Sequence, residues 1–358
     1  MLRVDRLNRL REKIKGNFDA FITLNPVNLR YLLDYRGEGS ILLVTEDKVL
    51  LYVNEMYLEQ AQKDCSDVEI IPVKKDWEGI LVRTLKREKV KKLAFESDIA
   101  FSTYRRLSSL TNGIELIPVE NFLDSIRAIK DEEEINLIKK SAEIADLAFM
   151  HLKSFIKPGV KEQDLVAEFS YFVRKKGATV SFEPIILYGE ASSLPHGIPG
   201  SREIKSDGIL LIDYGAKYNG YCSDATRTFF LGKPSKEYSK IYNIVLRALE
   251  TAKSIIKPGV PVSEVDRTAR EIITKEGFGD NFIHSTGHGV GLEIHEYPRL
   301  AEGDGALIEK GMVLTVEPGI YIKGFGGVRI EDLVVVTDSG IEVLTRIGKD
   351  FEFKGGNI

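Results

Sequence analysis

The second part of this 358-residue sequence contains an internal repeat, which limits how the chain can fold. The segment Ile156-Lys-Pro-Gly-Val160 returns as Ile256-Lys-Pro-Gly-Val260, and residues with helical periodicity follow each copy. A pair of predicted strands comes next in each copy, and each pair carries two carboxylates. These are Asp213 and Asp224 in the first copy and Glu317 and Glu331 in the second. The shared order of turn, helix, strand and carboxylate predicts two similar halves, with four carboxylates about a pseudo-twofold axis.

The N-terminal part of the sequence follows a different pattern, in which short apolar segments alternate with helical stretches. Strands are predicted at 18–24, 41–45, 49–53, 68–73, 92–95 and 114–119, and helices at 57–63, 77–88 and 101–110. This alternation indicates an α/β domain with a mixed sheet. The acidic residues 131–134 suit the first turn of a long helix. We therefore predict two domains, 1–124 and 125–358, in a chain of the α+β or α/β class.

Composition and charge exclude several classes of protein. Hydrophobic residues make up 43% of the chain and charged residues 29%, as in soluble globular proteins. The net charge is −4, and the basic residues are interleaved with apolar ones, which argues against a nucleic-acid surface. The N-terminus lacks the apolar stretch of a signal peptide or membrane span. With only two cysteines, far apart, we expect no disulfide framework and a cytoplasmic location.

The negative charges of the four carboxylates in the repeat must be balanced by nearby cations if these side chains are buried. Asp213 and Glu317 each end an apolar run that otherwise has the pattern of a buried strand, and burying an unpaired carboxylate is costly. Salt bridges are one explanation, with Arg227, Arg329 or Lys323 as partners. These cations are too few to pair with all four acids, which favours a metal centre.

A histidine-rich segment supplies a further ligand. It runs His284-Ser-Thr-Gly-His288-Gly-Val-Gly-Leu-Glu-Ile-His295-Glu-Tyr-Pro-Arg299, and it holds three of the five histidines. Glycines on both sides of His288 let the backbone bring its imidazole close to a metal. The zincin pattern His-Glu-x-x-His is absent because position 299 is Arg.

The charge of this ligand set indicates how many metal ions it binds. Four carboxylates and one neutral imidazole carry about four negative charges, which two divalent cations balance. Oxygen-rich ligation favours Mn or Co. Two such ions can together activate a water molecule and polarise a substrate carbonyl.

These motifs resemble the creatinase/aminopeptidase family with the pita-bread fold, which includes methionine aminopeptidase, aminopeptidase P and prolidase. The resemblance covers essentially the whole chain. It implies a duplicated, pita-bread C-terminal domain after a smaller, creatinase-like α/β domain. It also implies two divalent metal ions per subunit, Mn or Co, with Zn or Fe as alternatives. The implied metal ligands are Asp213, Asp224, His288, Glu317 and Glu331.

The resemblance further implies roles for residues around the metals. Glu317 is expected to act as general base, and His196 and His295 to hydrogen-bond the substrate or the developing oxyanion. Arg299 matches a position that binds the substrate carboxylate in prolidases, and Tyr321 is expected to line the substrate pocket. Two alternatives remain open for Arg329, which either binds substrate or pairs with a ligand carboxylate.

The implied activity is hydrolysis of the peptide bond before proline. The length of the chain favours Xaa-Pro dipeptides as substrates, and aminopeptidase P activity on longer peptides is the alternative. A metal-free creatinase-like hydrolase and a binding protein of the same fold are less favoured, because both predict lost ligands. The resemblance also implies a homodimer, and it places His284 beside the ligands unless that residue is structural.

Overall fold

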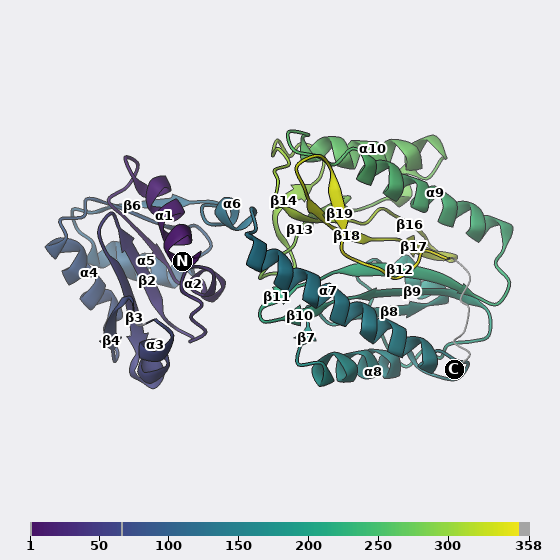
Figure 1. Cartoon of the computed structure of the whole chain (residues 1–358), viewed down its shortest axis with the longest axis horizontal. Coiled ribbons are helices and arrows are strands. Elements are labelled where there is room, and N and C mark those ends of the chain that lie inside the picture. Colours follow the sequence, from purple (N-terminus) through teal and green to yellow (C-terminus); the bar gives the residue numbers. More distant parts are fainter. Residues whose placement is uncertain (1, 66, 351–358) are drawn as a thin grey trace. The chain divides into compact units, whose positions relative to one another are not determined.

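The computed structural model describes residues 2–65 and 67–350. The chain divides into two compact units, Met1–Arg127 and Ala128–Ile358, called unit 1 and unit 2 below (Figure 1). Within the described ranges, no helix combines the length and the apolar character needed to cross a membrane.

Unit 1 is built on a mixed sheet of six strands in the order β4-β3-β2-β1-β5-β6. The strands are β1 (Ala20–Thr23), β2 (Ile41–Thr45), β3 (Val49–Asn54), β4 (Glu69–Val73), β5 (Lys92–Glu96) and β6 (Glu115–Val119). The pairs β1–β2 and β2–β3 are antiparallel, whereas β1–β5, β3–β4 and β5–β6 are parallel. Buried side chains such as Ile22, Leu43 and Leu93 form its core. The predicted α/β class with a mixed sheet is confirmed.

The helices of unit 1 were predicted only in part. The helices are α1 (Leu2–Ile14), α2 (Pro26–Leu33), α3 (Leu58–Asp64), α4 (Trp77–Arg87), α5 (Phe101–Leu110) and α6 (Asp124–Arg127), with a 3₁₀ turn at Glu55–Tyr57. The predictions match α3, α4 and α5 closely but miss α1, α2 and the short α6. The signal for α2 was present, because Asn25 caps its N-terminus and Pro26 occupies its first turn.

The described part of unit 2, up to residue 350, contains two helix pairs and four sheets. The helices are α7 (Glu132–Leu152), α8 (Glu162–Lys175), α9 (Lys236–Ser254) and α10 (Val262–Lys275), with 3₁₀ turns at Lys153–Phe155, Gly189–Ser193 and Gly279–Asn281. The first-half strands are β7 (Thr179–Val180), β8 (Ile185–Tyr188), β9 (Gly208–Tyr214), β10 (Ala216–Tyr218), β11 (Tyr221–Cys222) and β12 (Ala225–Leu231). The second-half strands are β13 (Gly287–Gly289), β14 (Glu296–Leu300), β15 (Val313–Val316), β16 (Gly319–Ile322), β17 (Gly326–Arg329), β18 (Asp332–Val336) and β19 (Ile341–Val343). The sheet orders are β12-β9-β8, β11-β10-β7, β14-β13-β15-β18-β19 and β16-β17.

The acidic residues at the start of unit 2 begin a helix as predicted. Asp131 caps α7 by accepting the N–H of Glu134 at 2.9 Å, and the Glu134 carboxylate accepts the N–H of Asp131 at 3.0 Å. This reciprocal capping box satisfies two backbone donors at the helix N-terminus.

The sequence repeat corresponds to a structural repeat. Each Ile-Lys-Pro-Gly-Val segment joins two helices, α7 to α8 or α9 to α10. The N–H of Gly159 donates to Ile204 O at 2.9 Å, and the N–H of Gly259 donates to Ile308 O at 2.8 Å. Both glycines have a φ near +90°, a conformation that other residues adopt only with strain.

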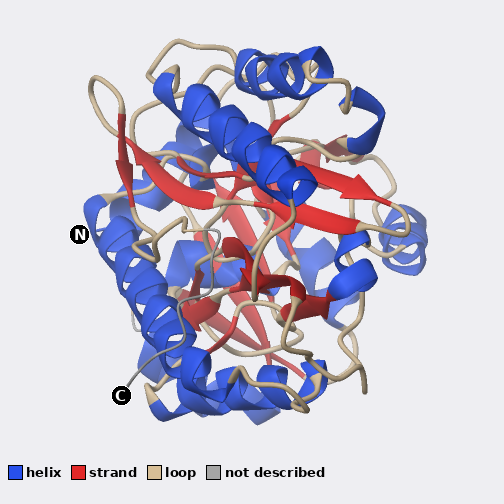
Figure 2. Ribbon diagram, turned by 90° about the vertical axis from the view of Figure 1, so that its right-hand side faces the viewer, coloured by secondary structure: helices blue, strands red, loops and turns tan. Residues whose placement is uncertain are grey.

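The helix pairs lie on opposite sides of the unit 2 strands. Figure 1 shows α9 and α10 on one side and α7 and α8 on the other, with β8, β9 and β12 between them. The view turned by 90° in Figure 2 also shows strands between helices. The helix pairs pack into two separate apolar clusters, one around Phe149 and Phe169 and one around Val245 and Ile273.

Candidate metal centre and substrate pocket

The four predicted carboxylates all lie at strand ends in unit 2. Asp213 is near the end of β9, and Asp224 directly precedes β12. Glu317 directly follows β15, and Glu331 directly precedes β18. Oxygen atoms of Asp213, Asp224 and Glu331 lie within 4.8 Å of one another, which is close enough for a shared metal ion.

His288 and Glu317 complete this cluster. Nε2 of His288 lies 3.3 Å from Oε1 of Glu317 and 3.7 Å from Oδ2 of Asp224. Nδ1 of His288 lies 3.0 Å from the carbonyl oxygen of Gly289, which can only accept a hydrogen bond. Nδ1 therefore donates its proton to Gly289, and Nε2 is the ring atom that faces the carboxylates and would bind a metal.

The glycines beside His288 are required by the close approach of neighbouring strands. A Cβ atom on Gly287 would lie 2.0 Å from Thr315 O, and one on Gly289 would lie 2.5 Å from Tyr297 O. Thr315 also holds this region through its side chain, because its Oγ1 accepts the N–H of His288 at 3.0 Å. The same hydroxyl donates to Oε1 of Glu317 at 3.1 Å. Thr315 thus sets the positions of two predicted ligands, a role that the sequence did not reveal.

Arg329 is buried behind the carboxylates. Its Nη2 donates to Oδ2 of Asp213 at 2.6 Å, and its Nη1 donates to the Tyr321 hydroxyl at 2.8 Å. Its Nε donates to Oγ1 of Thr226 at 3.1 Å, and that hydroxyl donates to Oε2 of Glu331 at 2.7 Å. These bonds support the ion-pair alternative for Arg329, which holds Asp213 directly and Glu331 through Thr226.

Tyr321 and His284 extend this network. Because Arg329 can only donate, the Tyr321 hydroxyl accepts from it and donates to Nε2 of His284, 2.9 Å away. Nδ1 of His284 then donates to Ser285 O at 2.7 Å. Burial lowers the pKa of His284, consistent with this neutral tautomer. Tyr321 is nearly fully buried, so it contacts the network rather than open solvent.

A pocket of about 550 Å³ opens beside the carboxylates. Its lining includes three further predicted residues, His196, His295 and Arg299. The His295 ring lies 4.3 Å from the His288 ring, between centroids. The pocket also has apolar lining residues, Phe182, Ile185 and Ile294, which the sequence did not mark because they are isolated along the chain.

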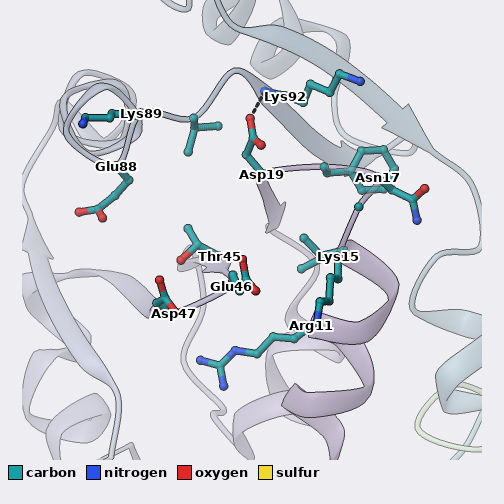
Figure 3. A pocket seen from close by; sticks show the side chains of 14 residues that line it. Arg11, Lys15, Asn17, Asp19, Thr45, Glu46, Asp47, Glu88, Lys89 and Lys92 are labelled. Carbon is teal, nitrogen blue, oxygen red and sulfur yellow. Dashed lines mark hydrogen bonds between the residues drawn. The ribbon is translucent and has the colours of Figure 1, made fainter.

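A second hollow, of about 500 Å³, lies in unit 1 and has a different character (Figure 3). Among the described residues that line it, none is a histidine, and most of its charged side chains are exposed. Two of its acids already have partners, since Asp19 accepts the N–H of Lys92 at 2.8 Å and Glu88 pairs with Lys48 at 2.7 Å. The chemistry-bearing cluster is therefore in unit 2.

Comparison with known proteins agrees with this geometry. The model of metallopeptidase family M24 matches residues 136–338. The chain belongs to this family. A creatinase/prolidase N-terminal domain model matches residues 6–129. The resemblance found in the sequence is thereby confirmed, and the chain is a metal-dependent peptidase.

Relatives within the family cover nearly the whole chain. The Xaa-Pro dipeptidase of Pyrococcus furiosus is 38% identical over 97% of this chain and 99% of its own. The structure of an Xaa-Pro dipeptidase from Bacillus anthracis superposes with a TM-score of 0.94, at 39% identity over 98% of this chain and 99% of that one. The structure of an X-Pro aminopeptidase from Thermotoga maritima has a TM-score of 0.87, at 36% identity over 96% of this chain and 99% of that one.

The buried acids of this M24 chain fit the divalent metal that its family requires. Oδ1 of Asp213 and Oε1 of Glu331 are buried and have no hydrogen-bond partner within the described residues. Burial and then neighbouring carboxylates raise the pKa of Asp224 and of Glu331 well above the ordinary range. An arrangement of this kind stabilises ionised carboxylates only when a cation is bound among them.

Glu317 behaves differently from the other acids in the M24 site. Burial alone would raise the pKa of Glu317, but its hydrogen bond to His288 and the charge of that ring lower it to about 2. The same contact raises the pKa of His288 despite the burial of the ring. Without a metal, the two side chains therefore form an ion pair, and metal binding to His288 requires loss of its proton.

Proposed function

We propose that this M24 peptidase hydrolyses the peptide bond before proline in Xaa-Pro dipeptides. The observation that carries the proposal is the group of buried carboxylates, two of which have an oxygen without a hydrogen-bond partner among the described residues, beside a pocket whose lining includes the exposed Arg299. Its relatives in Pyrococcus furiosus and Bacillus anthracis, both named Xaa-Pro dipeptidase, support the choice of substrate. Aminopeptidase P activity on longer peptides is the alternative that the assay below tests.

In this proposal two divalent ions, Mn or Co, bind Asp213, Asp224, His288, Glu317 and Glu331, and Zn or Fe are alternatives. Such ions supply Lewis-acid activation of the substrate carbonyl and of the attacking water. The proposed ligands need little rearrangement, because strand ends and the hydrogen bonds of Thr226, Thr315 and Arg329 already hold them.

Glu317 is proposed as the general base. Its carboxylate is ionised at neutral pH, because the contact with His288 lowers its pKa, and it lies among the proposed ligands beside the attacking water. The Thr315 hydroxyl donates to Oε1, which fixes the orientation of this side chain. Glu317 would pass the proton on to the leaving nitrogen of proline, which needs it to become an amine.

His196 and His295 are proposed to hydrogen-bond the substrate. Both lie exposed on loops at the pocket, where a bound peptide can reach them. Burial, followed by the neighbouring His288, lowers the pKa of His295, so its ring is neutral at physiological pH. A neutral ring still has one N–H, which can donate to the carbonyl oxygen as negative charge develops there.

Arg299 is proposed to bind the free carboxylate of the proline residue. Its Nε donates to Oγ of Ser285 at 3.2 Å, and within the described ranges the other guanidinium nitrogens form no hydrogen bond or ion pair. A guanidinium with two available donors suits a carboxylate. A longer peptide has an amide at that point, so Arg299 would favour dipeptides. The apolar residues Phe182, Ile185 and Ile294 would contact the proline ring or the side chain before it.

Three further parts of the proposal concern the whole protein. We propose a homodimer, a cytoplasmic location, and functional domains of 1–124 and 125–358, close to the division into compact units at 127/128. Sedimentation equilibrium would test the dimer, since a monomer across the micromolar range contradicts it.

The deciding experiment measures release of proline from Leu-Pro and cleavage of Leu-Pro-Gly by metal-stripped protein resupplied with Mn or Co. We expect activity to return with metal and kcat/KM to be higher for the dipeptide. Preference for the tripeptide would replace the dipeptidase proposal with aminopeptidase P. Full activity after complete metal removal would contradict the proposed catalytic roles.

A further inference from the structure

We propose that Lys130 and Glu296 form a buried ion pair that positions His295 for catalysis. The inference rests on the proposed role of His295 and adds two residues that are not among the predicted ligands or substrate groups, although Glu296 also lines the pocket. Lys130 belongs to the segment that enters unit 2, and Glu296 is the first residue of β14. They are 166 residues apart in sequence.

The two charges are enclosed by the protein. Nζ of Lys130 lies 3.0 Å from Oε2 of Glu296, and the side chains are only 1% and 3% exposed. The backbone of Lys130 is fixed as well, because its N–H donates to Gly311 O at 3.0 Å. Lys130 is therefore held at its main chain and at its charged end.

The Glu296 carboxylate also determines the shape of the loop before it. Its Oε1 accepts the N–H of Glu293 at 3.1 Å, and the N–H of Gly291 donates to Glu293 O at 3.0 Å. A Cβ atom on Gly291 would lie 2.4 Å from Oε2 of Glu296, so the carboxylate packs directly on the glycine backbone. The N–H of Cys222 donates to Gly291 O at 2.7 Å and ties the loop to β11. One carboxylate thus joins the loop 290–296 to Lys130.

His295 is the residue next to Glu296 on this loop. Because the two residues share a peptide bond, fixing the Glu296 side chain and the start of β14 also fixes the backbone from which the His295 side chain projects. His295 is exposed at the pocket, with its ring close to that of His288. Its ring hydrogen bonds to no described residue, so the loop backbone and the contact with His288 set its position. The Lys130–Glu296 pair is the buried charged contact that holds this backbone.

Stability alone does not explain a buried pair of this kind. The desolvation of two charges largely cancels their attraction, so two apolar side chains would stabilise the fold about as well. What the pair adds is a fixed direction, because a charged hydrogen bond is satisfied in only a narrow range of geometries. A fixed direction matters for this loop, because it carries the His295 ring, which is proposed to hydrogen-bond a substrate oxygen.

The test uses Glu296→Gln and Lys130→Met, with Lys130→Arg as the conservative variant. Each is expected to keep the circular dichroism spectrum and the metal content of the wild type. With Leu-Pro as substrate, Glu296→Gln and Lys130→Met should lower kcat about 10- to 100-fold, as expected for a misplaced catalytic group, with little change in KM. Lys130→Arg keeps the cation and should lose much less. Variants that lose the native spectrum or the metals would overturn the proposal.

Combining Glu296→Gln with His295→Ala distinguishes a loss of activity that acts through His295 from a loss caused by a wider disturbance of the site. If the pair acts through His295, adding Glu296→Gln to His295→Ala should cause no further loss. A double variant whose loss is the product of the two single losses would overturn the positioning role while leaving that of His295 intact. Full activity of His295→Ala would overturn both roles.

A second measurement is independent of turnover. The chain has only five histidines, so the ring signals of His295 can be assigned by NMR with the His295→Ala variant. In Glu296→Gln these signals should shift or broaden, whereas in Glu78→Gln they should stay unchanged. Glu78 is a matched control, because its side chain is 4% exposed and paired with Arg106 in unit 1. Unchanged His295 signals in Glu296→Gln would contradict the proposal.

Discussion

Replacing Arg329 by Met tests whether this residue holds the carboxylates rather than the substrate. The Arg329 side chain is 4% exposed and forms an ion pair with Asp213. It also donates to the hydroxyls of Tyr321 and Thr226. Methionine fills a similar volume but has no donor, so the change leaves a buried carboxylate and two hydroxyls without this partner. The metal-free protein should show the largest effect, because no other bound cation is then present at Asp213.

The expected destabilisation follows from those contacts. Removing one partner of a buried ion pair typically costs about 3–5 kcal/mol. For a domain of about 150–250 residues, each kcal/mol lowers Tm by roughly 2–4 °C, which gives a decrease of roughly 6–20 °C. Protonation of Asp213 would relieve part of this cost, so the lower end of the range is expected at acidic pH.

Thermal unfolding in EDTA, followed by circular dichroism, measures this decrease. Arg267→Met is the control, because Arg267 also pairs with two acids, Glu264 and Glu271, but is 62% exposed. Exposed pairs contribute about 0–1 kcal/mol, so the control should shift Tm only slightly. If Arg329→Met shifts Tm no more than the control does, the role assigned to Arg329 is wrong.

Further predictions concern catalysis and pH. Glu317→Gln should lower kcat about 100- to 10,000-fold without changing the circular dichroism spectrum, and a fully active variant would contradict its role as general base. Arg299→Met should lower kcat/KM for Leu-Pro about 10- to 100-fold, the value of a charged hydrogen bond, and should affect Leu-Pro-Gly little; equal losses would argue against carboxylate binding. Burial, opposed by the Thr23 hydrogen bond, raises the pKa of Glu96 to about 7. In the folded protein Glu96 therefore keeps its proton up to about pH 7, whereas in the unfolded chain it loses the proton near pH 4.5. This difference contributes about 3 kcal/mol to the free energy of unfolding below pH 4.5, and the contribution is lost as the pH rises to about 7. Urea unfolding of Glu96→Gln should show a weaker pH dependence over this range, and identical slopes would refute the assignment.

The repeat and the acids of unit 2 were predictable because each leaves a local signal. An acid at the end of an apolar run, such as Asp213, is unusual wherever it occurs, and Gly159 and Gly259 mark equivalent turns. Helix α1 also had a signal, since Leu7, Leu10 and Ile14 follow helical spacing and are buried.

Other features depend on residues that only the fold brings together. The role of Arg329 was ambiguous in the sequence, because nothing local shows that it faces Asp213 across 116 residues. The same holds for Lys130 and Glu296, which are each ordinary charged residues until they are buried against one another. The role of Thr315 has even less of a signal in the sequence, because threonine is common in strands and its hydroxyl acquires a role only through the residues that the fold places beside it.

The structure also refines the idea that the two halves carry equivalent carboxylates. Thr226, two residues after Asp224, pairs across the sheet with Asp213. Leu333, two residues after Glu331, pairs with Thr315 rather than with Glu317. In strand register, Thr315 is therefore the counterpart of Asp213, and Glu317 lies two residues further along.

A shift of two residues keeps the side chain on the same face of the strand, so Glu317 still points toward the centre. Because of this shift, Thr315 occupies the position in the second half that Asp213 occupies in the first. The Thr315 hydroxyl accepts the N–H of His288 and donates to the Glu317 carboxylate. In the first half, the strand beside Asp213 instead carries Ile185, which pairs with it directly and lines the pocket. The second half therefore has the imidazole of His288 where the first half has the apolar side chain of Ile185. This break in the pseudo-symmetry accounts for the single histidine among the predicted ligands of a duplicated fold.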